Sequence, residues 1–500
     1  MSAKAGIGRL IGAGLVLSLL PRLAFGESLY DSLLLAYQTN PSLRAQEADL
    51  RATDESYVQA RAGAGPQISL NGQYSYQSAR VQQPGSFFSS PSTANFQGSN
   101  GSADLSLVQP LYAAGATDAR IRTASDDILA GRQTLREAEN QLLLNVVTAY
   151  VDVRQDRQSV QIINDEIANL KGEFDETKTK GDLGVLTKTD VAQAQERLLS
   201  AQAQLKIAMG NLSISNAEYL NVVGQNPGEL DPEPDLAGLP ATADEAFAAA
   251  DANNPRLLEA IETERSARDK VRQAKAANGP TVSMKVDAAI EPYLPYLQRY
   301  YDQSVTAAVV VNQPLFSSGL NSSKVREALE QDNQAQLTVE ATRRGVVQLV
   351  ARAWDQLTAS QDAATIEKQQ LAVEQEAVDG NRAEERVGTR STIDLLNAEL
   401  ELADTRRALV QAHHDQYVAE ASLLSAMGLL EIRYLVPAAQ RYDPGASLRH
   451  VETAHAVPWE GAIAAIDRIG EPAAPPPHLS APDAGAERPT ASSTTNVPVQ

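Results

Sequence analysis

An arginine and a carboxylate four residues apart, Arg390 and Asp394, have residue types and a spacing suited to a specific polar contact. On a helix, a spacing of four places both side chains on one face. Either this face carries a functional contact, or the two residues pair along the helix surface, which is worth about 0.3–0.5 kcal/mol and has no further function. The residue types alone leave both interpretations open.

The five histidines do not have the spacing of a metal site. His413 and His414 are adjacent, so on a helix they face different ways and cannot form an i,i+4 metal pair. We therefore interpret the histidines as exposed helix residues. The chain contains no GKS or GKT phosphate loop and no HExxH motif, and its many acidic residues suit solvated helix faces. The sequence predicts no enzyme, no cofactor and no metal.

Charge and composition indicate an exported acidic protein. The formal net charge of −20 argues against nucleic-acid binding through overall charge. Residues 1–26 have a basic front, an apolar run over 10–20 and a small-x-small site at 24–26, which is typical of a secretory signal peptide. A membrane anchor is the alternative, but this run is shorter than the ~20 residues that a spanning helix needs. The chain has no cysteine, and a mature end at Glu27 offers no thiol for lipidation.

The sequence is internally duplicated, which predicts a first structural repeat over 27–240 and a second over 241–435. The motifs recur in the same order, with NPSL at Asn40 and NPRL at Asn254, GPQISL at Gly65 and GPTVSM at Gly279, and QPLYAAG at Gln109 and QPLFSSG at Gln313. An insertion rich in proline, glycine and serine lengthens the first repeat between its two strands. The chain is therefore built from two copies of one unit.

Each repeat is predicted to contain a helix, two strands and two long helices. Alternating apolar and polar residues predict strands at about 66–78, 102–112, 280–291 and 303–314. Long stretches without proline, with apolar residues at heptad spacing, predict helices at about 113–180, 187–224, 317–386 and 391–430. Large and small seam residues alternate, which favours two closely packed antiparallel helical hairpins.

The strands favour insertion in a membrane. Each has about the length of a tilted membrane-spanning strand, with one apolar face, as in Ile68 and Leu70 or Val309 and Val311. The alternative is a small soluble sheet packed on the helices. Backbone edges cannot face lipid, so a membrane sheet must close, and four strands are too few to close alone. The barrel would then be shared between protomers, with eight, twelve or sixteen strands from two, three or four chains.

The C-terminal part of the chain divides into two segments. Residues 436–470 are interpreted as a C-terminal segment that packs against the outside of the helical region at its equator. Residues 471–500 are rich in proline, alanine, serine and threonine, which is typical of a disordered tail.

Together, the duplicated motifs, TKTDVAQAQ and VGTRSTIDLLNAELEL resemble the TolC family of outer-membrane exit ducts. This resemblance implies an α+β membrane protein, in which a homotrimer forms a twelve-stranded β-barrel in outer-membrane lipid and a twelve-helix α-barrel across the periplasm. It further implies docking through a periplasmic adaptor to an inner-membrane ABC, RND or MFS transporter. Because the mature chain would begin at Glu27 rather than at a cysteine, it is more similar to the unlipidated branch that includes type I secretion ducts.

The resemblance also implies a gate at the periplasmic end. Arg390 matches the family's inner-helix arginine, with Thr189 and Asp190 as its outer-helix partners. Glu385 stands near the position where relatives often carry a tyrosine, and it would repel Asp190 instead of donating a hydrogen bond. Asp394 matches the first of two aspartate rings in the lumen, while Asn397 stands at the second.

The leading hypothesis is a passive, trimeric outer-membrane channel for efflux or type I secretion that extends into the periplasm. The alternative is a periplasmic coiled-coil scaffold or adaptor without a membrane barrel. The cargo, drug or polypeptide, is not indicated by the sequence.

Overall fold

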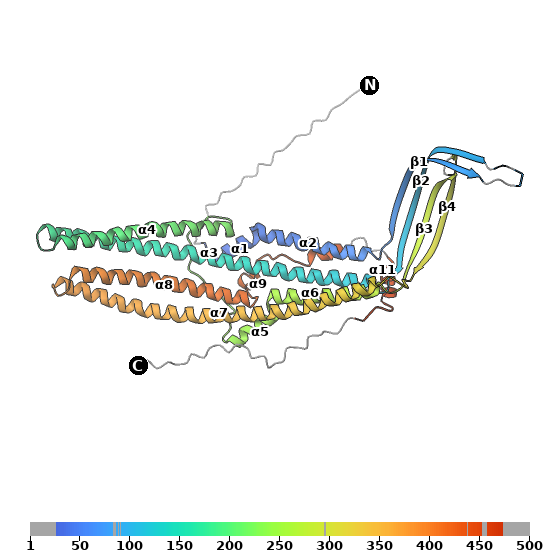
Figure 1. Cartoon of the computed structure of the whole chain (residues 1–500). Coiled ribbons are helices and arrows are strands. Elements are labelled where there is room, and N and C mark those ends of the chain that lie inside the picture. The colour runs from blue at the N-terminus through green and yellow to red at the C-terminus, as the bar shows by residue number, and fades with distance from the viewer. Residues whose placement is uncertain are drawn as a thin grey trace, which may run out of the picture.

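The computed structural model describes residues 27–83, 87–88, 90, 92–294, 297–437, 439–452 and 458–473. The predicted signal peptide, 1–26, and residues 474–500 of the predicted tail lie outside this range. Figure 1 shows an elongated molecule in which long helices lie side by side and a sheet projects from one end of them.

The same order of elements occurs twice. The first set is α1 (Leu29–Thr39), α2 (Pro41–Ala62), β1 (Gln67–Gln83), β2 (Ser92–Tyr112), α3 (Ala116–Asp182) and α4 (Lys188–Val223). The second set is α5 (Ala243–Asn253), α6 (Pro255–Ala276), β3 (Thr281–Leu294), β4 (Leu297–Asn312), α7 (Leu320–Arg386) and α8 (Thr392–Ala426). The chain continues through α9 (Ile432–Leu435), α10 (Ala446–Glu452) and α11 (Glu460–Asp467). Because α3 and α7 have 67 residues each, both extend about 100 Å.

The repeated motifs have repeated structural roles. Asn40 and Asn254 are the N-caps of α2 and α6, and each side chain accepts hydrogen bonds from two backbone N–H groups. Their amides also donate to the last turns of the long helices, Asn40 to Val222 O and Asn254 to Ala426 O. The NP motifs therefore tie the short equatorial helices to the ends of α4 and α8.

The main apolar core lies where the two repeats meet, around the middle of α3 and the ends of α4 and α8. Tyr150 is completely buried there, and its hydroxyl donates to the backbone oxygens of Glu27 and Asp231 at 2.9 and 2.8 Å. Toward the hairpin tips the described apolar clusters are much smaller. The two hairpins, α3–α4 and α7–α8, are thus held mainly at one level.

The four strands form one antiparallel sheet in the order β1-β2-β3-β4. Its register aligns apolar residues across all strands, because Ile68 lies opposite Leu107, Leu107 opposite Val286, and Val286 opposite Ala307. The other face carries polar pairs such as Asn71 with Asp104 and Ser106 with Asp287. One face is apolar across the middle of the sheet, and β1 and β4 are the outer strands.

The strands are longer than the alternation indicated. β1 ends at Gln83 instead of about 78, β2 begins at Ser92 instead of about 102, and β4 begins at Leu297 instead of about 303. The start of β2 is rich in glycine, serine and asparagine, which have low strand propensity, but it pairs in register with β1. Part of the predicted loop between the first two strands is therefore strand.

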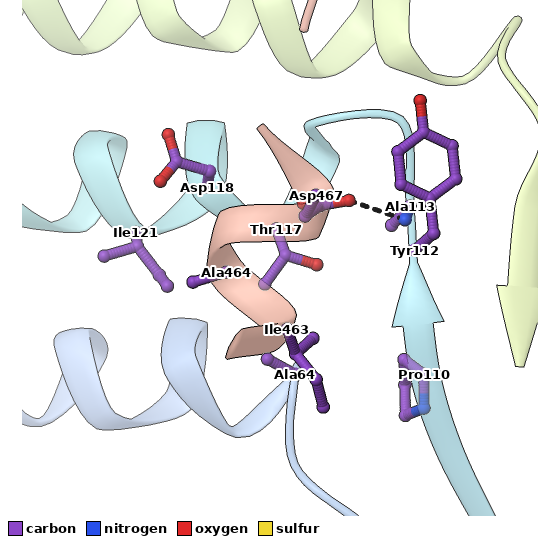
Figure 2. Close-up of a pocket in the computed structure, with 10 residues that line it drawn as sticks. All are labelled: Ala64, Pro110, Tyr112, Ala113, Thr117, Asp118, Ile121, Ile463, Ala464 and Asp467. Carbon is purple, nitrogen blue, oxygen red and sulfur yellow. Dashed lines mark hydrogen bonds between the residues drawn. The ribbon is translucent and has the colours of Figure 1, made fainter. Parts of the chain in front are cut away.

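The C-terminal segment contacts the first repeat at several levels. α10 lies against α2, and α11 lies at the junction of β2 and α3. Figure 2 shows the Asp467 carboxylate of α11 beside this junction, where it accepts hydrogen bonds from the backbone N–H groups of Ala113 and Gly115 at 2.6 and 3.2 Å. At the matching junction of the second repeat, Leu315 and Phe316 are 92% and 88% exposed. The duplicated units thus differ in what covers them.

No helix within the described ranges combines the length and the apolarity needed to cross a bilayer.

Candidate gate at the hairpin tips

The two helical hairpins end side by side, far from the sheet (Figure 1). Gly184 and Gly388 form their turns with φ of +77° and +78°, a left-handed conformation that favours glycine. The six predicted site residues lie in these turns or within the turns of helix beside them, and the structure shows contacts within one protomer for five of them: Asp190, Glu385, Arg390, Asp394 and Asn397.

Asp190 and Asp394 both stabilise helix starts. Asp190 accepts hydrogen bonds from the backbone N–H and hydroxyl of Thr187, both at 2.8 Å, which completes a capping box at the N-terminus of α4. Asp394 does the same for Ser391 at the N-terminus of α8, at 3.2 and 2.7 Å. These bonds lower the pKa of both carboxyls, chiefly through the Thr187 backbone N–H for Asp190 and the Ser391 hydroxyl for Asp394. The signal for this role, Ser or Thr three residues before an acid, was present in the sequence.

The expectation that Arg390 and Asp394 share a helical face is wrong. α8 begins after the N-cap Ser391, so Arg390 lies in the turn before the helix. Its guanidinium Nε donates to Glu384 Oε2 at 2.9 Å, and both side chains are half exposed. Among the described residues, the side-chain bonds of Arg390 go to Glu384 on its own hairpin rather than to Thr189 or Asp190.

Glu385 joins the two hairpins. Its carboxylate accepts hydrogen bonds from Lys180 Nζ of α3 at 3.1 Å and from the Thr392 hydroxyl at 3.4 Å. Lys180 also pairs with Glu176 at 2.9 Å, and hydrogen bonding to these carboxylates raises the pKa of its ammonium. The sequence identified Glu385 only by its repulsion of Asp190, because Lys180 lies far away in the chain.

Further polar contacts cross between the hairpins. Arg197 of α4 donates to Asn397 Oδ1 at 3.3 Å. Arg407 of α8 lies 3.6 Å from the buried Glu166 of α3 and donates to Gln204 Oε1 of α4 at 2.9 Å. We call the contacts Lys180–Glu385, Arg197–Asn397 and Arg407–Glu166 the inter-hairpin pairs. Because two are ionic, salt in the surrounding water weakens the connection between the tips.

The histidine interpretation holds for one of the adjacent pair and fails for the other. His413 is exposed, as predicted. His414 is only 14% exposed and lies between two carboxylates, one of them on α3. Within the described residues, the structure contains no group of three His, Cys, Asp or Glu side chains arranged to hold a metal ion.

The structure has long paired helices, a strand pair inserted in each repeat and an apolar face on the resulting sheet. These features define the class of outer-membrane channels with a helical tunnel. The chain belongs to the outer membrane efflux protein family, whose sequence profile matches residues 33–225 and 247–429. This match covers both repeats and confirms the resemblance to the TolC family.

Curated relatives cover nearly the whole chain. The outer membrane efflux protein BepC of Brucella suis is 30% identical over 438 residues, which cover 87% of this chain and 93% of that protein. The outer membrane protein TolC of Escherichia coli is 25% identical over 467 residues, covering 90% and 92%. The alkaline protease secretion protein AprF of Pseudomonas aeruginosa is 26% identical over 442 residues, covering 84% and 88%.

The fold is also shared with solved structures. The channel protein CusC superposes with a TM-score of 0.68 at 20% identity, covering 80% of this chain and 91% of that chain. The family consists of transport channels rather than enzymes, and membership places this protein in the outer membrane with its helices in the periplasm.

Proposed function

We propose that three copies of this chain form a passive exit duct, with a closed twelve-stranded barrel in the outer membrane and a twelve-helix tunnel below it. The observation that carries the proposal is the open sheet, whose outer strands β1 and β4 each have one strand neighbour. A bilayer does not satisfy free backbone N–H and C=O groups, so these edges must pair with other copies. The family resemblance favours three copies among the possible numbers.

Exposed apolar side chains on the helices support association over the full length. They lie on α4 and α7, which are not adjacent within the protomer and would meet in a ring: Leu199, Ile207, Ile214, Leu337, Ile366 and Val373. Burial of each would contribute roughly 1.5–3 kcal/mol if complete. The helical tunnel would thus be held by apolar contacts between protomers.

The hairpin tips would form the gate of this duct. The inter-hairpin pairs hold the tips together within one protomer, and contacts of Arg390 with Thr189 and Asp190 of another copy would compete with the Arg390–Glu384 and Asp190–Thr187 bonds within each chain. Asp394 would contribute a ring of carboxylates to the lumen, with Asn397 adding no charge to a second ring. The gate depends on polar contacts because the apolar core ends well before the tips.

The cargo would come from an inner-membrane ABC, RND or MFS transporter through a periplasmic adaptor. Named relatives support both cargo classes, since BepC is an efflux protein and AprF a protease secretion protein. We propose efflux or type I secretion as the transport process.

The test is the assembly and conductance of the full-length protein. It should pellet with outer membranes, resist carbonate extraction, have the native mass of a trimer and conduct ions in planar bilayers. A protein released by carbonate as a monomer would contradict the duct and favour the periplasmic scaffold. A stable dimer or tetramer with conductance would correct the number of copies.

A further inference from the structure

His414 of α8 lies between two carboxylates at the contact of α8 with α3. Its Nε2 is 2.7 Å from Asp152 Oδ1 of α3, and its Nδ1 is 2.9 Å from Asp415 Oδ1 of α8. An ionised carboxylate only accepts hydrogen bonds, so both ring nitrogens must donate. The arrangement therefore favours His414 as an imidazolium, whose positive charge would join carboxylates from both hairpins.

The contact extends along the helices. Gln411 donates to Asp415 Oδ1 at 2.8 Å, and Gln155 of α3 donates to the side-chain oxygen of Gln411. Three side chains, Asp415, Gln411 and Gln155, thus connect His414 to a second point on α3. The seam between α3 and α8 is polar here on both sides of the histidine ring.

A polar cavity of about 270 Å³ lies beside this contact, and the remaining charged groups around His414 line it. Arg154 of α3 is paired with Glu233 of the segment between the repeats, so its charge is matched. Asp235 of that segment adds negative charge, whereas burial raises the pKa of Glu420 of α8 and so opposes its charged form. These surroundings favour a positive charge on His414.

The contact between His414 and Asp152 lies at the end of the main apolar core, which is where the two hairpins could begin to separate. The main apolar core ends next to it, with Val153 on α3 and Ala419 on α8 among its last members. Beyond this level, toward the tips, the contacts between the hairpins include one small apolar cluster, the inter-hairpin pairs and the Arg407–Gln204 hydrogen bond. Hairpins that separate at the tips would pivot at the edge of the core, where His414 and Asp152 meet.

We propose that His414 is a positioning residue of the duct, which as an imidazolium holds α8 against α3 at this pivot, so that its deprotonation loosens the hairpins and favours opening. The proposal rests on the duct proposed above. It assigns pH sensitivity to one side chain and names its partner, Asp152.

The direction of the effect follows from the surroundings. Burial alone would oppose the charge, but the hydrogen bonds that the ring donates to Asp152 and Asp415 outweigh it and raise the pKa of His414 above its ordinary value. The stabilisation is fully present below the unfolded pKa of about 6.5 and is lost as the pH rises through the higher folded pKa. The tunnel should therefore loosen on the alkaline side.

The test compares wild type, His414→Gln and the matched control His413→Gln as full-length protein in planar bilayers, from about pH 6 to about pH 9. Wild type and His413→Gln should gain conductance as the pH rises. His414→Gln should show at pH 6 the conductance that wild type reaches at pH 9, without further change. A pH-dependent His414→Gln, or a wild type with flat conductance, would overturn the proposal.

A second measurement does not depend on conduction. Thermal unfolding of His414→Gln, Asp152→Asn and the double variant should show coupling between the two residues at about pH 6 that disappears at about pH 9. If the wild-type protein does not conduct at all, the proposed duct function is contradicted. The coupling between His414 and Asp152 then tests the role of His414 by itself. Additive effects at both pH values would exclude the contact.

Discussion

Removal of the Lys180 ammonium should open the proposed gate. Lys180 is the only basic partner of Glu385 among the described residues, and Glu385 is 15% exposed, so the contact is partly shielded from water. In Lys180→Met the chain retains a side chain of similar length but loses the bond between α3 and α7. Glu385 would then lie near Glu173, whose pKa is raised by burial and by neighbouring carboxylates, so repulsion would add to the loss.

The size of the effect follows from the number of copies. An ion pair of this exposure contributes about 0.5–1 kcal/mol. If the three hairpin pairs of a trimer move together, the closed state loses roughly 1.5–3 kcal/mol, since the contributions of distant copies add. At about 1.4 kcal/mol per factor of ten, the ratio of open to closed channels should rise about tenfold to a hundredfold. Stability of the trimer should hardly change, because its apolar core is untouched.

Single-channel recording measures this ratio directly. The matched control is Lys178→Met, which removes the same charge from an exposed position two residues earlier. Glu385→Gln should open the channel like Lys180→Met, and the double variant should add little. Equal open probability in wild type and Lys180→Met, or an equal increase in Lys178→Met, would refute the argument that this pair holds the hairpins together.

Three further predictions concern the sheet and its junction. Val309→Arg, on the apolar face, should destabilise the inserted barrel by about 2–4 kcal/mol, and Thr306→Arg, on the polar face, much less; equal trimer yields in membranes would contradict the register. Phe87 and Phe88 are almost fully exposed at the end of the β1–β2 hairpin, so an epitope inserted between them should bind antibody on intact cells. Binding only after outer-membrane permeabilisation would show that this hairpin faces the periplasm. Asp467→Ala should leave the backbone N–H groups of Ala113 and Gly115 without their acceptor, which costs about 1–3 kcal/mol of stability. The temperature at which trimers dissociate on gels should therefore fall in this variant, and it should not fall in the control Asp443→Ala, which changes an exposed side chain.

The sequence predicted the features that depend on periodicity and failed where long-range contacts decide. The alternation around Ile68 and Leu70 depends only on the pleat of a strand, so the apolar face was predicted correctly. The strand ends were wrong because pairing with β1 overrides the low propensity of the first residues of β2. Register with a neighbouring strand is not visible in the composition of a segment.

The gate residues also differ in whether a local pattern or a long-range contact determines their role. The assumption that α8 already includes Arg390 was wrong because Ser391 caps the helix, a local signal that a capping-box search would have found. The partners of Glu385 and His414 could not be found this way, since Lys180 and Asp152 lie on the other hairpin. Which two faces meet is set by the packing of the repeats, and one sequence does not encode it in any short pattern.

The contact of α11 with the junction of β2 and α3 has a consequence for the symmetry of the proposed trimer. A trimer of duplicated chains has six similar junctions between strands and helices, and six identical junctions would make it mechanically uniform around its axis. In the proposed trimer Asp467 would fix the junction of each first repeat, while Leu315 and Phe316 at each second repeat are exposed among the described residues of the chain. Stiff and flexible junctions between strands and helices would therefore alternate around the proposed trimer. Strain that arrives from the periplasmic side would then be taken up at three places rather than six, each next to the outer strand β4, where the proposed trimer would place a neighbouring chain.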